Sequence, residues 1–270
     1  MERKIVKDII IPQLNRNRKI RVYLPYDYFI SNKNYPVLYM HDGQNLFDKS
    51  EHSGYSWEVD KTLDNLQREG VTDGIIVVGI DCNREGFKRL DEYSPWKNFE
   101  IPKMLDKSEL EYVGGEGEEY SKFIVETLKP MIDSEFRTLK DRQNTMIAGS
   151  SMGGVISLYI GIKYQDIFSK IGAFSTAAWF AEEELIDFIE ENLTTVEMRI
   201  YLDIGTNETS NDKIKEFPDI YVNGTLRLNE TISRKISIEN VKLLIDEGAT
   251  HSEKYWAKRF PEFIKFIYNK

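Results

Sequence analysis

The stretch that most constrains the fold lies at residues 144–154 (Asn-Thr-Met-Ile-Ala-Gly-Ser-Ser-Met-Gly-Gly). Residues 146–148 are apolar and predict the end of a buried strand, and residues 155–160 have the composition of a buried helix. Between them, residues 149–153 match the pattern Gly-x-Ser-x-Gly, which places Ser151 at a sharp strand-to-helix turn, a nucleophile elbow. The alternative is an ordinary Gly-Ser turn between two core elements, but the flanking strand and helix patterns favour the elbow.

Apolar strand patterns alternate with amphipathic helix patterns along most of the chain. The predicted strands cover residues 8–12, 19–25, 37–40, 74–80, 146–148, 170–174, 199–204 and 241–245. The predicted helices cover residues 57–66, 120–132, 155–160, 181–192, 226–235 and 256–267. The first two strands suit an antiparallel pair, whereas the later apolar runs are typical of strands covered by helices on both faces. This order predicts an α/β fold with a mostly parallel central sheet and one domain over residues 1–270.

One segment, residues 83–117, is long, polar and aromatic, and it shows no clear periodicity. Connections of this length inside compact domains are usually functional or poorly ordered. The sequence leaves open whether the segment acts as a lid.

Composition and charge narrow the classes of partner. Hydrophobic residues make up 41% of the 270 residues, enough for a large core. A net charge of -9 argues against nucleic acid and anionic membranes as partners. The single cysteine, Cys82, excludes an internal disulfide framework and a multi-cysteine metal site. The first residues lack the apolar region of a signal peptide, and no apolar run approaches the roughly 20 residues of a membrane-spanning helix, so a cytoplasmic location is expected.

A serine nucleophile needs a base to accept its proton, and three histidines are candidates. His41 ends the third predicted strand, His52 lies in a Ser/Glu-rich loop, and His251 follows the last predicted strand. In the chain order serine, acid, histidine, only His251 comes after Ser151. A lone histidine after a strand is often structural, but the elbow pattern favours His251 as the base.

The acid that orients this histidine is expected in a loop after a strand between Ser151 and His251. Glu208, just past Gly-Thr-Asn at residues 205–207, has this position. Asp212 is the second candidate in the same loop, and Asp203 lies within the predicted strand, where a structural role is expected. We therefore favour Glu208.

The oxyanion of a tetrahedral intermediate requires two preorganised backbone donors. The N–H of Met152, directly after the predicted nucleophile and at a helix N-terminus, is the first candidate. The second is the N–H of Gln44, since Gly43 allows the backbone to turn and aim it. The alternative for this second segment is a plain polar loop.

With these motifs in place, the sequence resembles the esterase family of the α/β-hydrolase superfamily. This family includes esterase D-like, feruloyl and acetyl-xylan esterases and enterochelin-esterase-like enzymes. The resemblance runs from about Arg21 to the last predicted helix. It rests on residues 39–47, 79–81, 92–95, 120–130, 148–154 and 205–208 and on His251. The sequence departs from many members by having Glu208 where they have Asp, and Asp-Gly-Gln at residues 42–44 where they have His-Gly-Gly.

The resemblance implies a metal-free serine hydrolase without a cofactor, in which Ser151 and His251 match the nucleophile and base. It implies a small-molecule ester substrate, such as an acylated sugar or aryl ester, and leaves the ester and the oligomeric state open. Acyl transfer to another alcohol and a catalytically silent scaffold that binds a ligand or partner are the alternatives. The intact serine, histidine and elbow pattern argue against the silent scaffold.

Two further residues are candidates for substrate binding. Trp179 follows the sixth predicted strand and is placed to stack on a sugar or aryl group, with core or lid packing as the alternative. Arg89 lies in the long segment and is a candidate to bind a substrate carboxylate. Its alternative is an ion pair with Asp91 or Glu92.

Overall fold

The computed structural model describes residues 2–51, 53–104, 110–194 and 197–268. Over these residues, one eight-stranded sheet has the order β1-β2-β4-β3-β7-β8-β9-β10. Its strands are β1 (Lys4–Ile11), β2 (Arg16–Tyr23), β3 (Val37–His41), β4 (Ile76–Ile80), β7 (Thr145–Ser150), β8 (Lys170–Phe174), β9 (Arg199–Gly205) and β10 (Val241–Asp246). The pairs β1–β2 and β2–β4 are antiparallel, and all other neighbours are parallel. The predicted mostly parallel sheet is confirmed.

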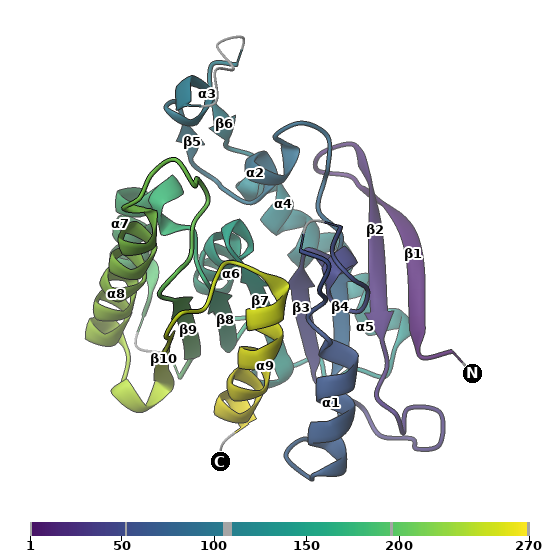
Figure 1. The fold of residues 1–270 in the computed structure, drawn as a ribbon. Helices are drawn as coiled ribbons and strands as arrows, with labels where there is room; N and C mark the ends of the chain where they lie inside the picture. The colour runs from purple at the N-terminus through teal and green to yellow at the C-terminus, as the bar shows by residue number, and fades with distance from the viewer. Residues whose placement is uncertain (1, 52, 105–109, 195–196, 269–270) are drawn as a thin grey trace.

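Helices connect these strands and cover both faces of the sheet (Figure 1). The α-helices are α1 (Val59–Arg68), α2 (Lys88–Glu92), α3 (Ile101–Met104), α4 (Gly117–Lys122), α5 (Lys129–Glu135), α6 (Met152–Lys163), α7 (Glu182–Asn192), α8 (Phe217–Lys235) and α9 (Glu253–Tyr268). The shorter turns are η1 (Gly43–Asn45), η3 (Arg142–Asn144), η4 (Ala178–Phe180) and η5 (Ile238–Asn240), and a π-helical stretch, η2 (Phe123–Leu128), joins α4 to α5. No described helix is long and apolar enough to cross a bilayer.

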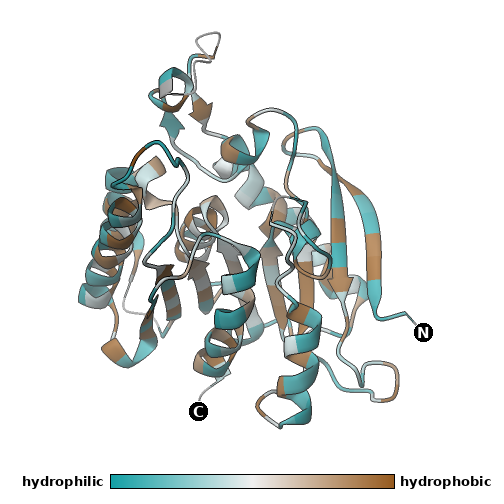
Figure 2. Ribbon diagram, in the orientation of Figure 1, coloured by the Kyte–Doolittle hydropathy of each residue, from teal (hydrophilic) through white to brown (hydrophobic). Residues whose placement is uncertain are grey.

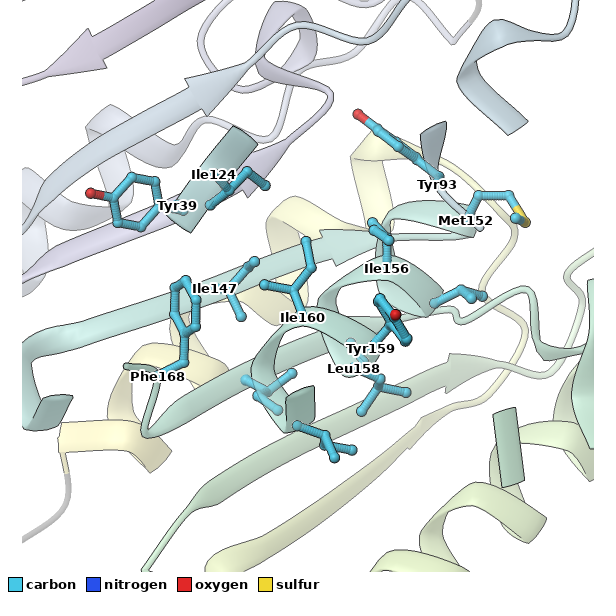
Figure 3. Packing of buried hydrophobic residues seen from close by; sticks show 14 of the residues in the cluster. Tyr39, Tyr93, Ile124, Ile147, Met152, Ile156, Leu158, Tyr159, Ile160 and Phe168 are labelled. Carbon is cyan, nitrogen blue, oxygen red and sulfur yellow. The ribbon is translucent and has the colours of Figure 1, made fainter. Parts of the chain in front are cut away.

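The strands of the parallel region are apolar on both sides because each side packs against a helical layer. Successive side chains of a strand point to opposite faces. Ile147 of β7 therefore packs in one core cluster with Ile156 and Ile160 of α6, as Figure 3 shows. Met146 and Ala148, its neighbours in β7, belong to the second cluster, with the apolar side chains of α1 and α9. Figure 2 shows the resulting hydrophobic strands between helices whose outer surfaces are hydrophilic.

The antiparallel hairpin at the start of the chain differs from this region. Along β1, more exposed side chains alternate with less exposed ones, and Val6 and Ile10 remain largely exposed. The alternation arises because one face of the hairpin contacts solvent. The predicted antiparallel pair is confirmed.

Two sequence expectations about element boundaries are corrected. The helix expected at residues 226–235 is α8, which begins at Phe217 with a proline in its first turn. Proline suits that position because its missing N–H would have no helical acceptor there. The segment 83–117 contains α2, α3 and the two-stranded sheet β5 (Lys97–Asn98) and β6 (Val113–Gly114), which stand at the top of Figure 1.

Candidate active site

Ser151 occupies a strained turn between a buried strand and a buried helix. β7 ends at Ser150 and α6 begins at Met152, and Ser151 has φ 59° and ψ -125°. A positive φ is costly for a residue with a side chain, and it persists only where the surroundings enforce it. Here the Ser151 N–H donates to the Phe174 carbonyl (2.9 Å), and the Ser151 carbonyl accepts from the Ala177 N–H (3.2 Å). The turn is therefore tied to the end of the neighbouring strand β8.

Two glycines allow the strand and helix to approach closely at this turn. A Cβ on Gly149 would lie 2.7 Å from the Gly153 carbonyl oxygen, and a Cβ on Gly154 would lie 2.7 Å from Oγ1 of Thr176. Neither position accommodates a larger residue without displacing its neighbours. Gly149 and Gly154 are thus favoured by the close packing around Ser151.

A cavity of about 1310 Å³ opens beside this turn. The parallel strands all end at this edge of the sheet, so the loops after β3, β7, β9 and β10 meet there. Its walls include Gln44, Ser151, Asp212, His251 and Trp256. Among the described residues there is no group of three or more His, Cys, Asp or Glu side chains that could hold a metal ion.

His251 lies in this cavity and contacts a buried carboxylate. Its Nδ1 is 2.7 Å from Oε2 of Glu208, and the two side chains are 17% and 0% exposed. An ionised carboxylate only accepts hydrogen bonds, so Nδ1 carries the proton and Nε2 is left as an acceptor. The rings of Tyr221 and Trp256 pack against the imidazole at centroid distances of 5.1 and 5.0 Å. The geometry thus holds Nδ1 of His251 against Glu208 and leaves Nε2 available to accept a proton.

Three groups hold the second oxygen of Glu208. Its Oε1 accepts from the Ser175 hydroxyl (2.6 Å) and from the Gly205 N–H (2.7 Å), and Nη2 of Arg259 lies 3.4 Å away. Burial raises the pKa of the Glu208 carboxyl, but the hydrogen bond and charge of His251, the Ser175 hydroxyl and the Arg259 charge together lower it below its ordinary value. Glu208 is therefore held as a carboxylate.

The other two candidate acids are placed differently. Asp212 lies on the cavity wall, and no hydrogen bond or ion pair joins it to another described side chain. Asp203 is buried within β9, where its Oδ1 accepts from the Ser175 N–H (3.1 Å) and its Oδ2 lies 3.1 Å from Nε of Arg259. Of the three acids, Glu208 contacts His251.

The two predicted oxyanion donors lie where the loop after β3 meets the start of α6. A Cβ on Gly153 would lie 3.3 Å from Cβ of His41 and 3.5 Å from Oδ2 of Asp42, so the first turn of α6 packs against this loop. Over the described chain, neither the Met152 N–H nor the Gln44 N–H has a hydrogen-bond acceptor. The Gln44 side chain accepts from the Cys82 N–H (3.0 Å), which fixes the loop.

Arg89 lines the cavity, but its ion pair differs from either expected partner. Its Nε and Nη2 donate to the two oxygens of Asp42, each at 2.8 Å. Asp91 and Glu92 instead pair with Lys88 and Arg18. Burial raises the pKa of Asp42, and the Arg89 guanidinium lowers it below its ordinary value.

Neither Trp179 nor His41 is among the described residues that line the cavity. Trp179 packs against Phe217 at a centroid distance of 5.4 Å and is absent from the described lining of the cavity, so its position gives substrate stacking no support. His41 is 2% exposed, and its Nδ1 lies 3.0 Å from the Tyr120 hydroxyl. His52 lies outside the described residues.

Sequence patterns did not single out Ser175 and Arg259, two of the groups that hold Glu208. Ser175 follows β8 and has φ 44°, while Trp256 and Arg259 come from α9. The available signal was the position of Arg259 among buried aromatic residues on the apolar face of α9. A buried arginine requires a carboxylate partner.

Comparisons with known proteins assign the chain to a family. The family described as "Putative esterase" matches residues 11–267, so the chain belongs to that family. Uncharacterized protein YbbA of Bacillus subtilis is 26% identical over 256 residues, which span 94% of each protein. The BES protein from Bacillus cereus has a similar fold, with a TM-score of 0.75, 19% identity and coverage of 99% of this chain and 95% of that one. The enterobactin esterase FES from Shigella flexneri also has a similar fold, with a TM-score of 0.72 and 15% identity. The match covers 97% of this chain and 58% of that one.

Family membership and fold together define the class of protein. The α/β-hydrolase fold expected from the sequence is confirmed by these structures. The chain is a carboxylic ester hydrolase, as the sequence resemblance implied.

Proposed function

We propose that this enzyme hydrolyses a small carboxylic ester through an acyl-enzyme on Ser151. One observation carries the proposal. Ser151, at a positive φ, shares a cavity with His251, whose Nδ1 lies 2.7 Å from the buried Glu208 carboxylate. Nucleophile, base and orienting acid thus follow the order and the loops that a serine hydrolase requires.

In the proposed reaction, Nε2 of His251 accepts the Ser151 proton as the hydroxyl oxygen attacks the ester carbonyl carbon. The imidazolium that forms is stabilised by Glu208 and then donates its proton to the departing alcohol. Water, deprotonated by the same histidine, next attacks the acyl-enzyme and releases the carboxylic acid. Ser151 recovers its proton in this last step.

The N–H groups of Met152 and Gln44 are proposed to hold the oxyanion. Both are free of protein acceptors within the described residues, and Met152 opens the 12-residue helix α6. A helix N-terminus stabilises negative charge through its dipole and its unpaired N–H groups. Such donors stabilise the transition state more than the neutral ester because charge develops on the oxygen.

The cavity supports a polar substrate. Its described walls include the side chains of Asn45, Asn83, Thr209 and Ser210, and Arg89 lies among them. Arg89 uses Nε and Nη2 on Asp42, which leaves Nη1 to donate to an oxygen of the substrate. An acylated sugar or an aryl ester with polar substituents fits this lining.

A fluorophosphonate probe with a reporter group tests the nucleophile. Wild-type enzyme is expected to be labelled at Ser151, and Ser151→Ala to abolish both labelling and ester hydrolysis while the melting temperature stays near that of wild type. Ser150→Ala is the matched control, since Ser150 lies next to Ser151 on the same cavity but ends the strand. Labelling that persists in Ser151→Ala, or that is lost in Ser150→Ala alone, would refute the assignment.

A further inference from the structure

Two buried carboxylates share one buried cation behind His251. Asp203 and Glu208 are each 0% exposed, and Arg259 of α9 is 2% exposed. Nε of Arg259 lies 3.1 Å from Oδ2 of Asp203, and its Nη2 lies 3.4 Å from Oε1 of Glu208. A buried charge is costly unless it is compensated, and here one positive charge faces two negative ones.

Ser175 connects all three of these groups. Its N–H donates to Oδ1 of Asp203, and its Oγ accepts from Nη2 of Arg259 and from Nε1 of Trp256, both at 2.8 Å. A serine hydroxyl has a single proton, and both of these partners are donors. The Ser175 proton must therefore point to Glu208, whose Oε1 lies 2.6 Å away.

This arrangement separates the two oxygens of Glu208 by function. Oε1 accepts from Ser175 and from the Gly205 N–H, so it is saturated within the protein. Oε2 is left for His251. Without Arg259, Ser175 would lose one of the two donors that set the direction of its proton.

The pKa values of the two carboxyls shift in opposite directions, although the charge of Arg259 lowers both. Burial raises the pKa of Asp203 to about 7, with the Arg259 charge opposing this rise and the Glu208 charge adding to it. The pKa of Glu208 is lowered despite its burial, chiefly by His251. Asp203 is thus the carboxyl that takes up a proton near neutral pH, and Glu208 stays ionised.

We propose that Arg259 is a positioning residue for the hydrolytic reaction. Through Ser175 and through its charge, it keeps Glu208 ionised and directed at His251, while Asp203 competes for the same guanidinium. This inference rests on the proposed function, since it presumes that Glu208 orients the catalytic base.

Other charged and titratable groups facing this cluster come from each element packed around it. Tyr201 of β9 has a raised pKa because it is buried beside Asp203. Asp246 of β10 lies 3.9 Å from Nη1 of Arg259, and it also pairs with the exposed Lys258. Glu262 on α9 pairs with Lys242 and Lys265, and Tyr221 on α8 faces Glu208. Of the groups named, only Asp203 combines full burial with a pKa of about 7.

The test measures kcat, KM and the pH profile of kcat/KM for Arg259→Met, Arg259→Lys and Asp203→Asn. Rates are normalised to active sites titrated with fluorophosphonate, so unfolded protein does not count. Arg259→Met is expected to lower kcat about 10- to 100-fold with little change in KM, and to move the acidic limb to higher pH by about 0.5 unit or more. The acidic limb of kcat/KM shifts to higher pH because loss of a positive charge favours protonation of neighbouring groups.

Asp203→Asn is expected to move the limb in the opposite direction, because it removes the competing negative charge while keeping the acceptor for the Ser175 N–H. Arg259→Lys keeps the charge, so its limb should stay near wild type while kcat falls less than in Arg259→Met. These two variants decide the matter even if Arg259→Met does not fold.

If Arg259 only stabilises the fold, all three variants should have a lower melting temperature, and the acidic limb of kcat/KM should stay at the wild-type pH in the protein that remains folded. That result would overturn the inference. Glu208→Gln, measured in parallel, separates this failure from failure of the proposed function. If Glu208→Gln is inactive and the limbs do not move, only the role of Arg259 is wrong. If Glu208→Gln is fully active, the proposed triad itself is wrong.

Discussion

A histidine lies at the end of β3 and another follows the end of β10, near the same edge of the sheet, but the two side chains have different surroundings. His41 is the last residue of β3, is nearly fully buried, and has an unpaired Nε2 within the described structure. His251, after β10, is partly exposed in the cavity and contacts the Glu208 carboxylate. Burial lowers the pKa of His41 to about 3, so that it stays neutral at physiological pH.

The comparison shows that position at a strand end does not make a histidine a base. A base needs access to the substrate and a group that stabilises the charge it acquires. His251 lines the cavity and contacts a carboxylate, whereas Nδ1 of the buried His41 lies next to the Tyr120 hydroxyl. The proposed division of roles between these two histidines yields three predictions.

The largest effect is expected for His251→Ala. Loss of the proposed base should lower kcat about 10³- to 10⁶-fold without a comparable change in KM, because the proton transfer occurs only in the transition state. Steady-state kinetics on one activated ester measure this. His41→Ala, the matched replacement at the other strand end, should retain turnover. An inactive His41→Ala beside an active His251→Ala would reverse the assignment.

A smaller but still large effect is expected for Glu208→Gln. The amide can donate to Nδ1 and so favours the wrong imidazole tautomer, which should lower kcat about 10²- to 10⁴-fold. Asp212→Asn is the control, since Asp212 lies in the same loop without contacting His251. If Asp212→Asn loses the activity and Glu208→Gln keeps it, the acid is Asp212. Full activity in both variants would mean that serine and histidine act without an acid.

The smallest effect on activity is expected at His41, where the readout is stability against pH. The pKa of His41 is about 3 in the folded state, below the ordinary value of about 6.5 expected on unfolding, so the unfolded state binds the extra proton between these pH values. Its contribution to the free energy of unfolding is present above pH 6.5 and is lost as pH falls, by about 1.4 kcal/mol per unit.

The variant His41→Gln lacks this titration. Urea unfolding at pH 7 and pH 4.5 should therefore show the stability of wild type relative to His41→Gln falling by about 2–3 kcal/mol at the lower pH. The comparison with the variant cancels groups that titrate in both proteins. An equal difference at both pH values would show that His41 is not buried in its neutral form.

The sequence predicted the fold well because its strongest signals are local. The apolar runs at β3, β7 and β9 mark buried strands by themselves, and the turn around Ser151 is specified by adjacent glycines. The start of α8 was missed although Pro218 is a start signal, because the apolar pattern becomes regular only later in the helix. Two-residue strands such as β5 and β6 carry no periodicity at all.

The candidate site was predictable only where chain order constrains it. Ser151, Glu208 and His251 follow the ends of β7, β9 and β10, and their order in the chain predicted that they lie at the same edge of the sheet. The contact between Arg89 and Asp42 and the contact between Arg259 and Ser175 join residues far apart in the sequence. Such pairs depend on how loops and helices pack, and no local pattern encodes that packing.

Helix α9 follows every strand of the sheet in chain order and supplies both Trp256 and Arg259 to Ser175. During synthesis, then, all the strands of this sheet are made before the helix that supports Glu208. A local opening that detaches this one helix would remove both of these donors from Ser175. The proposed triad therefore depends on the docking of a single late element, and activity is expected to disappear at a lower denaturant concentration than the circular dichroism of the sheet.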